Sequence, residues 1–228
     1  MNFNALVAAI QLELNDYSSR SKTRIEKWVN ECHRSICQSR RWSFLVVRES
    51  DTMTIGTADM PIDIETDIEV SGSAVAAQNV LSIYDVTDGT YEYIQMTTLD
   101  QLRDSFPTDY GQAGAPDFWY YLNNKNIQFF PTLEEDRDFI FSFQKKLITY
   151  ATGAATALLI PDEYVDVLQE LVLYKAYRYK TDDRANACLE NYTMLLDAMI
   201  KAESNKAGII YDQPRLMPAR LPLLSDDS

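Results

Sequence analysis

The sequence predicts an α+β protein, with a helical bundle formed by N- and C-terminal helices, an inserted β-rich module and an extended C-terminal arm. Three observations predict it. Apolar residues recur every three or four positions near both ends of the chain, β-branched and aromatic runs separated by turn residues fill the middle, and prolines recur at four-residue intervals near the C-terminus. The expected segments are N-terminal helices over residues 1–43, a β-rich insertion (sandwich or small barrel) over 44–152, a C-terminal helical hairpin over 153–207 and the arm over 208–228.

The N-terminal region predicts two helices. Residues 4–14 place apolar side chains on one helical face, and a longer helix follows over residues 21–41. The apolar stripe of the longer helix consists of Ile25, Trp28, Val29, Cys32 and Ile36. The C-terminal helices also carry an apolar stripe. We expect the two stripes to pack against each other, because apolar side chains are unfavourable in water.

In the middle of the chain, turn-forming residues separate pairs of apolar runs, a pattern that predicts β-hairpins. Asp88-Gly89 separates two apolar runs, and residues 123–126 separate two aromatic runs. Residues 44–48 and 139–143 predict further strands, and residues 99–105 predict a short helix.

Two helices are expected at the C-terminal end. One follows Pro161, where acidic residues favour a helix N-terminus, and the second starts after Thr181 and ends at a cap formed by Ala207-Gly208. Near-heptad spacing in the second helix predicts a helix–helix seam, formed by Ala185, Cys188, Leu189, Tyr192, Leu195, Leu196, Met199 and Ala202.

Composition and charge limit the classes of function that the chain can have. The 228 residues are 46% hydrophobic, which is typical of a globular chain, and the formal net charge is −13. Such a charge disfavours DNA binding through the overall field of the protein. The odd number of cysteines, three, argues against a disulfide framework and therefore favours a reducing compartment. The N-terminus has no signal-peptide pattern and the longest apolar stretch, 154–160, is too short to span a bilayer, so we expect assembly in a cytoplasm without membrane association.

Histidine and cysteine are sparse in the chain, whereas carboxylates are plentiful. Cys32, His33 and Cys37 form the only metal-like cluster and offer no fourth ligand, so no metal and no cofactor are expected; Cys32 is expected in the core and His33 on the surface. His33 is the only histidine, which removes most nucleophile–base schemes, and no catalytic residue is expected. The acidic run Glu134-Glu135-Asp136 is interpreted as a solvated turn, although a carboxylate pair of a hydrolase stays open as an alternative.

Basic residues concentrate on or beside the helix at 21–41. Eight of the 21 Lys and Arg residues lie there: Arg20, Lys22, Arg24, Lys27, Arg34, Arg40, Arg41 and Arg48. The first five are candidates for a subunit–subunit contact. A solvated helix face and a contact with DNA remain alternatives.

The C-terminal segment is apolar but interrupted by proline. Prolines at four-residue intervals prevent a helix, and disordered tails are ordinarily polar. Docking of the segment into a groove or onto a sheet edge of a partner therefore explains it better than disorder does. Packing on its own domain stays open. The candidate contact residues are Ile209, Ile210, Tyr211, Pro214, Arg215, Leu216, Met217, Pro218, Arg220, Leu221, Leu223 and Leu224.

Several short motifs, in order, resemble the head-to-tail adaptor proteins of short-tailed phages, which include the tail tubular protein A type. The motifs are Arg24-Ile-Glu-Lys-Trp-Val-Asn30, Ile36, Arg41-Trp42-Ser-Phe44-Leu45, Gly114-Ala-Pro116 before the aromatic run 118–121, Ile127-Gln-Phe-Phe-Pro131, and Ile160-Pro161-Asp-Glu-Tyr164. The likeness extends from about residue 20 to 200. Trp28, Trp42 and Phe44 are interpreted as core anchors.

The resemblance implies a structural virion protein of the neck and tail, assembled in the host cytoplasm and without enzymatic activity. It implies twelve copies in a ring between the portal protein and the tail nozzle protein, with a C-terminal arm that reaches the portal and DNA passing through the channel as cargo. A different neck, tail-completion or collar protein is the first alternative, and a tail-associated cell-wall hydrolase is the second.

Overall fold

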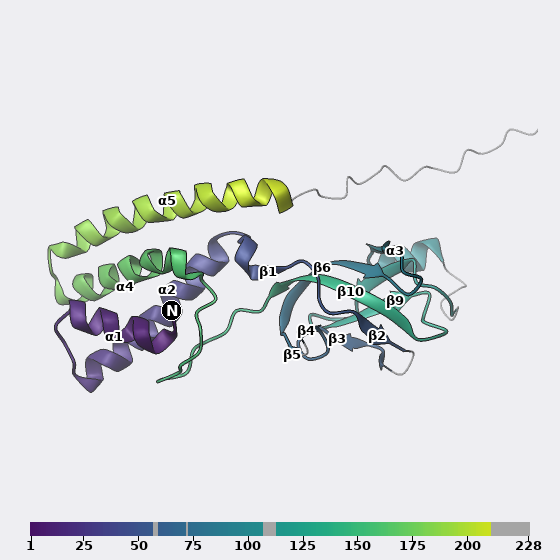
Figure 1. Ribbon diagram of the computed structural model, residues 1–228, viewed down its shortest axis with the longest axis horizontal. Helices are drawn as coiled ribbons and strands as arrows, with labels where there is room; N and C mark the ends of the chain where they lie inside the picture. Colours follow the sequence, from purple (N-terminus) through teal and green to yellow (C-terminus); the bar gives the residue numbers. More distant parts are fainter. Residues whose placement is uncertain (57–58, 72, 107–112, 211–228) are drawn as a thin grey trace, which may run out of the picture. The chain divides into compact units, whose positions relative to one another are not determined.

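The computed structural model describes residues 1–56, 59–71, 73–106 and 113–210, and the chain divides into two compact units (Figure 1). The helical unit comprises residues 1–43 and 152–228, and the β unit comprises residues 44–151. The described residues form a mixed α/β structure with five α-helices and a curled half-barrel sheet. The prediction of a mixed chain is therefore confirmed, and the expected sandwich or small barrel is a curled half-barrel.

Four α-helices form the described part of the helical unit: α1 (Phe3–Glu13), α2 (Ser19–Ser39), α4 (Val165–Lys180) and α5 (Arg184–Ile210), with a 3-10 turn η3 (Asp162–Tyr164) before α4. Helix α2 contacts both α1 and α4, and α4 also contacts α5. Side-chain caps start two of the helices, because Asn2 accepts a hydrogen bond from the Ala5 amide and Ser18 accepts one from the Ser21 amide.

Helix α5 continues beyond its predicted end. The Ala207-Gly208 pair was expected to cap it, but the helix runs to Ile210. A glycine raises the free energy of a helix by only about 1 kcal/mol relative to alanine, so it marks an end only when the following residues leave the helix. Ile209 and Ile210 therefore belong to α5 instead of the expected arm, and residues 211–228 lie outside the described part of the chain.

The β unit contains a 3-10 turn, one helix and ten described strands. These elements are η1 (Ser43–Leu45, which starts at the unit boundary), β1 (Val46–Val47), β2 (Met53–Ile55), β3 (Ile62–Asp63), β4 (Glu69–Val70), β5 (Ser73–Ala74), β6 (Ala77–Asp85), β7 (Glu92–Met96), α3 (Leu99–Ser105), β8 (Phe118–Tyr121), β9 (Asn126–Phe130) and β10 (Arg137–Lys145). The strand expected at residues 44–48 is thus a 3-10 turn followed by a two-residue strand.

The main sheet has the strand order β1-β10-β6-β7-β8-β9-β3, with β2 also pairing with β10, while β4 and β5 form a separate ribbon. Both predicted hairpins are confirmed, since β6 pairs with β7 and β8 with β9 in antiparallel register. Gly89 adopts φ +73° in the first turn, a conformation that glycine reaches without steric cost. The β7–β8 pair is parallel and is bridged by α3 and the segment that follows it.

Aromatic and aliphatic residues of the strands form the core of the β unit. Phe129 and Phe139 stack with ring centroids 4.5 Å apart, beside the buried Trp119, Phe141 and Phe143. A smaller apolar cluster joins Leu102 of α3 to Tyr120 and Phe130. The β unit therefore has its own hydrophobic core, and the three cysteines of the chain all lie in the helical unit.

Candidate interaction surfaces

Four of the five basic residues predicted for a subunit contact share one face of α2. Arg20, Arg24, Lys27 and Arg34 are spaced by three, four or seven residues and lie on the side of the helix opposite its buried stripe; we call them the basic stripe. Lys22 lies two residues after Arg20 and therefore points to another side of the helix. Glu31 lies within the stripe and pairs with Lys27 at 3.9 Å and with Lys175 of α4 at 3.0 Å.

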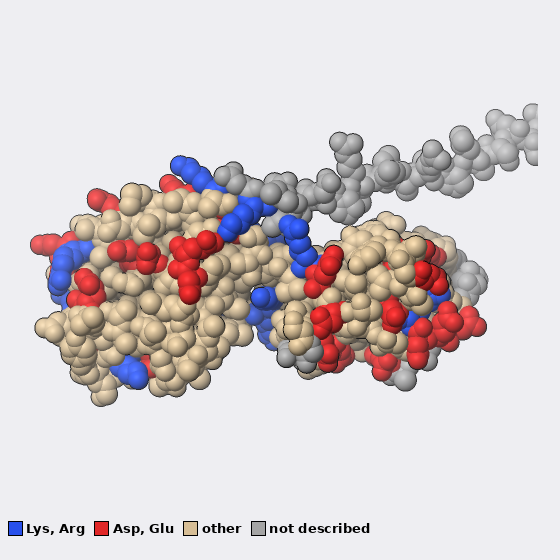
Figure 2. Space-filling model, in the orientation of Figure 1, with Lys and Arg blue, Asp and Glu red and all other residues tan. Residues whose placement is uncertain are grey.

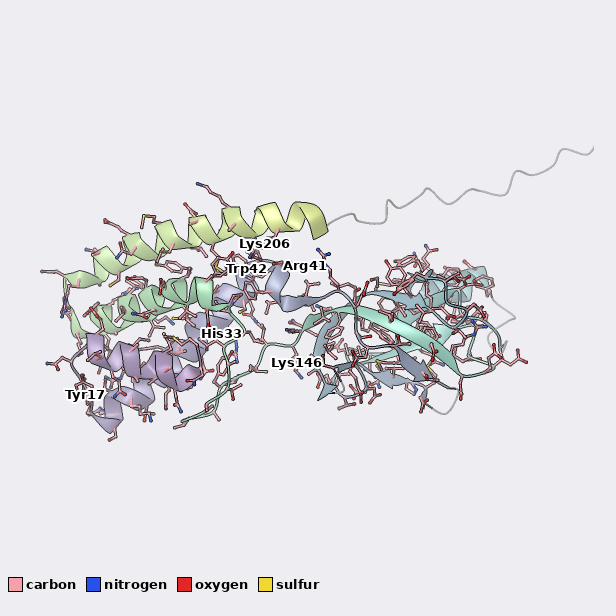
Figure 3. All side chains as sticks on the ribbon, in the orientation of Figure 1. Tyr17, His33, Arg41, Trp42, Lys146 and Lys206 are labelled. Atoms are coloured by element: carbon pink, nitrogen blue, oxygen red, sulfur yellow. The ribbon has the colours of Figure 1, made fainter. Side chains whose placement is uncertain are left out.

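Aromatic side chains border the basic stripe. The Arg24 guanidinium lies 4.0 Å from the centroid of the Tyr179 ring, and that ring lies 5.8 Å from the ring of Trp28. Tyr17 lies in the turn between α1 and α2 (Figure 3), and the neighbouring Asp16 pairs at 3.7 Å with Lys180, which brings this turn close to the C-terminal end of α4. Both rings are more than half exposed, at 63% and 58%.

The C-terminal half of α4 continues this combination of arginine and tyrosine. Arg178 donates a hydrogen bond of 3.1 Å to the Tyr174 hydroxyl, and the exposed Arg184 at the start of α5 covers the buried Tyr177 ring at 4.3 Å from its centroid. Tyrosine, tryptophan and arginine are the side chains most enriched at the centres of protein–protein interfaces. Their clustering with the basic stripe marks this end of the helical unit as a candidate interaction surface.

The β unit carries an acidic surface (Figure 2). Arg137 donates to Asp85 at 2.8 Å and to Glu135 at 3.2 Å, and so ties the β6–β7 turn to the β9–β10 turn. Exposed carboxylates surround this pair of turns: Asp88, Glu92, Glu134, Glu135 and Asp136, which we call the acidic turns. The run at 134–136 is thus a solvated turn, as the sequence predicted.

Asp85 is the buried centre of these turns. Burial raises the pKa of the Asp85 carboxyl, but hydrogen bonds from the Thr87 hydroxyl and amide and from Arg137 outweigh burial and leave the pKa below its usual value. Asp85 is therefore ionised at neutral pH. Beside it, Tyr84 contacts the rings of both Tyr91 and Tyr93, and the latter two are well exposed.

A buried carboxylate anchors the C-terminal end of α5. Glu203 is 4% exposed and accepts hydrogen bonds from the Ser43 amide and hydroxyl, from the Tyr164 hydroxyl at 3.1 Å and from Lys206 at 3.1 Å. Burial raises the pKa of Glu203, but these hydrogen bonds more than offset it, so the pKa is lowered. Lys206, labelled in Figure 3, also pairs with Glu163 at 2.8 Å, which holds this end of α5 beside η3.

The position predicted for His33 is wrong. The side chain was expected on the surface but is only 1% exposed, and burial lowers its pKa to about 4, so the ring is neutral at pH 7. The reason is that α2 packs against two neighbouring helices and therefore buries a wider arc than its apolar stripe alone. Cys32 is buried as expected, and burial raises the pKa of Cys32 and Cys37 to about 12, so neither is a thiolate at neutral pH.

The three predicted core anchors lie in different surroundings. Trp42 is fully buried in the helical unit and donates a hydrogen bond of 2.7 Å from Nε1 to the Ile36 carbonyl (Figure 3). Trp28 is half-buried under Arg24, and Phe44 is half-buried at the start of the β unit. The candidate arm residues from 211 onward lie outside the described residues.

Sequence reasoning missed the two polar networks and the aromatic border. Tyr179 lies about 150 positions from Arg24, and Arg137 lies about 50 positions from Asp85, so no local pattern connects the partners. The signals present were an Arg- and Tyr-rich stretch at 174–184 and a lone Arg after three acidic residues.

Exposed aromatic and charged surfaces on two compact units are typical of a structural protein that binds other proteins. Among the described residues, no group of three His, Cys, Asp or Glu side chains is arranged to hold a metal ion, and no helix is long and apolar enough to cross a membrane.

The chain belongs to the SU10 adaptor protein family, whose model matches residues 1–215. Membership makes it a phage adaptor, a structural component of the virion that associates with other virion proteins, and implies a role without enzymatic activity. No curated protein sequence matches the chain.

Proposed function

We propose that the chain is a head-to-tail adaptor of the tail tubular protein A type, forming a ring of twelve copies between the portal protein and the tail nozzle protein. Family membership over residues 1–215 is the observation that carries this proposal. The ring continues the DNA channel, in the neck of a virion assembled in the host cytoplasm.

The division of the chain into two units supports separate roles for its parts. The helical unit acts as a bundle that contacts neighbouring virion proteins, and residues 211–228 act as an extended arm that docks on the portal. The arm sequence combines leucines with regularly spaced prolines and two arginines, which suits a receiving groove or sheet edge. The polar network of Glu203 and Lys206 fixes the helix from which the arm departs.

The charge distribution supports passage of DNA without binding. The β unit carries six Lys and Arg residues against 18 Asp and Glu residues, a net charge of −12. Acidic surfaces repel phosphates, so DNA that passes such a surface slides instead of adhering.

Mixing the purified protein with purified portal and measuring the mass of the complex tests the proposal. The expected result is a discrete complex whose added mass corresponds to a closed ring of copies. Absence of any complex over a wide concentration range contradicts the proposal. A complex with the tail but not with the portal favours a tail-completion or collar protein instead.

The arm is tested by truncation after Ile210, which keeps the whole of α5. We expect the truncated protein to remain folded and to lose most of its affinity for the portal. A full-length variant with Leu216, Leu221, Leu223 and Leu224 changed to serine keeps the length and charge of the arm and is expected to lose affinity to a similar degree. Full affinity of both variants contradicts the docking of the arm.

A further inference from the structure

We propose that neighbouring copies of this chain bind each other through opposite charges, with the basic stripe of one copy receiving the acidic turns of the next. The basic stripe is Arg20, Arg24, Lys27 and Arg34, and the acidic turns are Asp88, Glu92, Glu134, Glu135 and Asp136. The inference rests on the proposed ring, because it names the contact by which the copies associate.

Two members of the basic stripe, Arg20 and Lys27, have charge that is free to pair. Lys27 has a 75% exposed side chain and only a long contact of 3.9 Å to Glu31, and within the described residues Arg20 makes no ion pair. Arg24 is held by the rings of Tyr179 and Trp28, which fixes the position of its guanidinium at the surface. A pre-positioned arginine loses less side-chain entropy when it pairs with a carboxylate.

Ion pairs hold the acidic turns, which are the proposed partner of the basic stripe, in fixed positions. Arg137 ties the two turns together through Asp85 and Glu135, so the surrounding carboxylates are presented on a fixed frame. In the described part of the chain, Asp88, Glu92 and Glu134 have no ion-pair partner. Carboxylates clustered in this way repel one another, and the repulsion is relieved when cations of a partner approach.

Aromatic rings accompany both surfaces. Tyr91 and Tyr93 lie beside the acidic turns, and Tyr17 and Tyr179 lie beside the basic stripe, all of them well exposed. Such rings supply apolar contact area and faces on which arginine stacks. Charge complementarity then sets orientation and association rate, while the aromatic contacts slow dissociation.

A second copy fits the basic stripe better than DNA does. The exposed rings of Tyr17 and Tyr179 near the stripe can pack against the exposed rings of Tyr91 and Tyr93 near the acidic turns, whereas a phosphate backbone offers no aromatic surface. The helical unit is nearly neutral, with 15 basic and 16 acidic residues, and the β unit has a net charge of −12, so each chain carries both halves of the contact. Two different surfaces make a heterologous contact, the type that generates rings.

Charge reversal with reciprocal rescue tests the inference on the full chain. The variants are Arg20→Glu with Lys27→Glu, Glu92→Lys with Glu134→Lys, and all four changes together. The matched control is Lys22→Glu with Lys201→Glu, which alters net charge as the first variant does but lies outside the basic stripe. Circular dichroism checks that every variant is folded.

The readout is the number of copies per complex and the protein concentration at half-assembly, measured by light scattering with and without portal. Each double reversal is expected to raise that concentration about tenfold or more. The fourfold variant is expected to return to within about threefold of the parent, and the control to stay at the parent value. Raising salt from about 50 mM to about 500 mM is expected to weaken assembly of the parent chain.

Three results overturn the inference. Reversals that leave assembly unchanged, or a fourfold variant no better than the double variants, exclude this contact while leaving the ring intact. Ring formation that survives Arg20→Glu with Lys27→Glu while binding to duplex DNA is lost assigns the stripe to DNA. Failure of the parent chain to assemble both alone and on the portal removes the proposed function together with the inference.

Discussion

The helical unit and the β unit differ most in charge. Nearly the whole net charge of −13 lies on the β unit, at −12, whereas the helical unit almost balances its 15 basic and 16 acidic residues. Balanced charge with exposed arginine and tyrosine favours association with other proteins, and uniform negative charge repels nucleic acid. In the proposed ring both units take part in assembly, because the basic stripe of the helical unit binds the acidic turns of a neighbouring β unit, while the excess negative charge of the β unit repels the DNA that passes.

The two units resemble each other in one respect, which is that each contains a buried carboxylate that several hydrogen bonds satisfy. Glu203 in the helical unit and Asp85 in the β unit are both nearly inaccessible, and hydrogen bonds hold the pKa of each below its usual value. Both carboxylates join segments that are distant in sequence. The separate cores and networks predict that each unit can be perturbed without the other.

The largest expected effects come from the two cores. Trp42→Ala and Phe139→Ala each remove a fully buried ring and are expected to destabilise the protein by about 3–5 kcal/mol. Hydrogen exchange followed by mass spectrometry is expected to show faster exchange in α2 and α4 for Trp42→Ala, and in β6 and β10 for Phe139→Ala. Faster exchange throughout both units in either variant means that the two units unfold together, which contradicts the independence of their cores.

The ion pair of the β unit gives the next largest effect. Arg137→Ala leaves the buried Asp85 without its cation and releases the link to Glu135, and is expected to cost about 3 kcal/mol in chemical denaturation. Lys125→Ala is the control, since its pair with Glu65 is exposed and is expected to contribute less than about 1 kcal/mol. Equal losses for both variants contradict a structural role of the Arg137 link.

The carboxylate network of the helical unit predicts a pH dependence. Because the folded-state pKa of Glu203 lies below its reference value of 4.5, its contribution is fully present above pH 4.5 and is lost as pH falls through the folded-state pKa. Glu203→Gln is expected to cost about 2 kcal/mol at pH 7.

The difference in stability between parent and Glu203→Gln should shrink on acidification below about pH 4.5. Unfolding curves of both proteins across this range check it, with Glu190→Gln, an exposed position of α5, as the control. A difference that stays constant with pH means that the charge of Glu203 is not what stabilises the network.

Local chemistry made much of the fold predictable. The helix predicted at 99–105 has its observed bounds, and in the structure a capping box of Thr98 and Gln101 fixes its start. The hairpin at Asp88-Gly89 was predictable because Gly89 supplies the positive φ of the turn. Strands β1 to β5 have two or three residues each and give no periodic signal, and the parallel β7–β8 pair depends on a crossover that leaves no local mark.

The candidate surfaces were predictable only in composition. The concentration of basic residues near α2 is visible in the sequence, but helix geometry was needed to separate Lys22 from the basic stripe. Tyr179, Arg137 and the burial of His33 depend on which elements pack together, which is decided by the whole fold.

The smallest expected effect concerns the segment that returns the chain to the helical unit. Gly153 adopts φ +74°, its amide donates to Glu26 of α2, and its carbonyl accepts a hydrogen bond of 2.6 Å from the Asn4 side chain. Gly153→Ala forces a β-carbon into a left-handed conformation and is expected to destabilise the helical unit by about 1 kcal/mol, while exchange in β6 and β10 stays unchanged. Apart from the chain neighbours of Gly153, no atom of the described residues lies within 4 Å of the added carbon, so backbone strain alone causes the loss. An unchanged midpoint of thermal unfolding therefore contradicts the left-handed conformation.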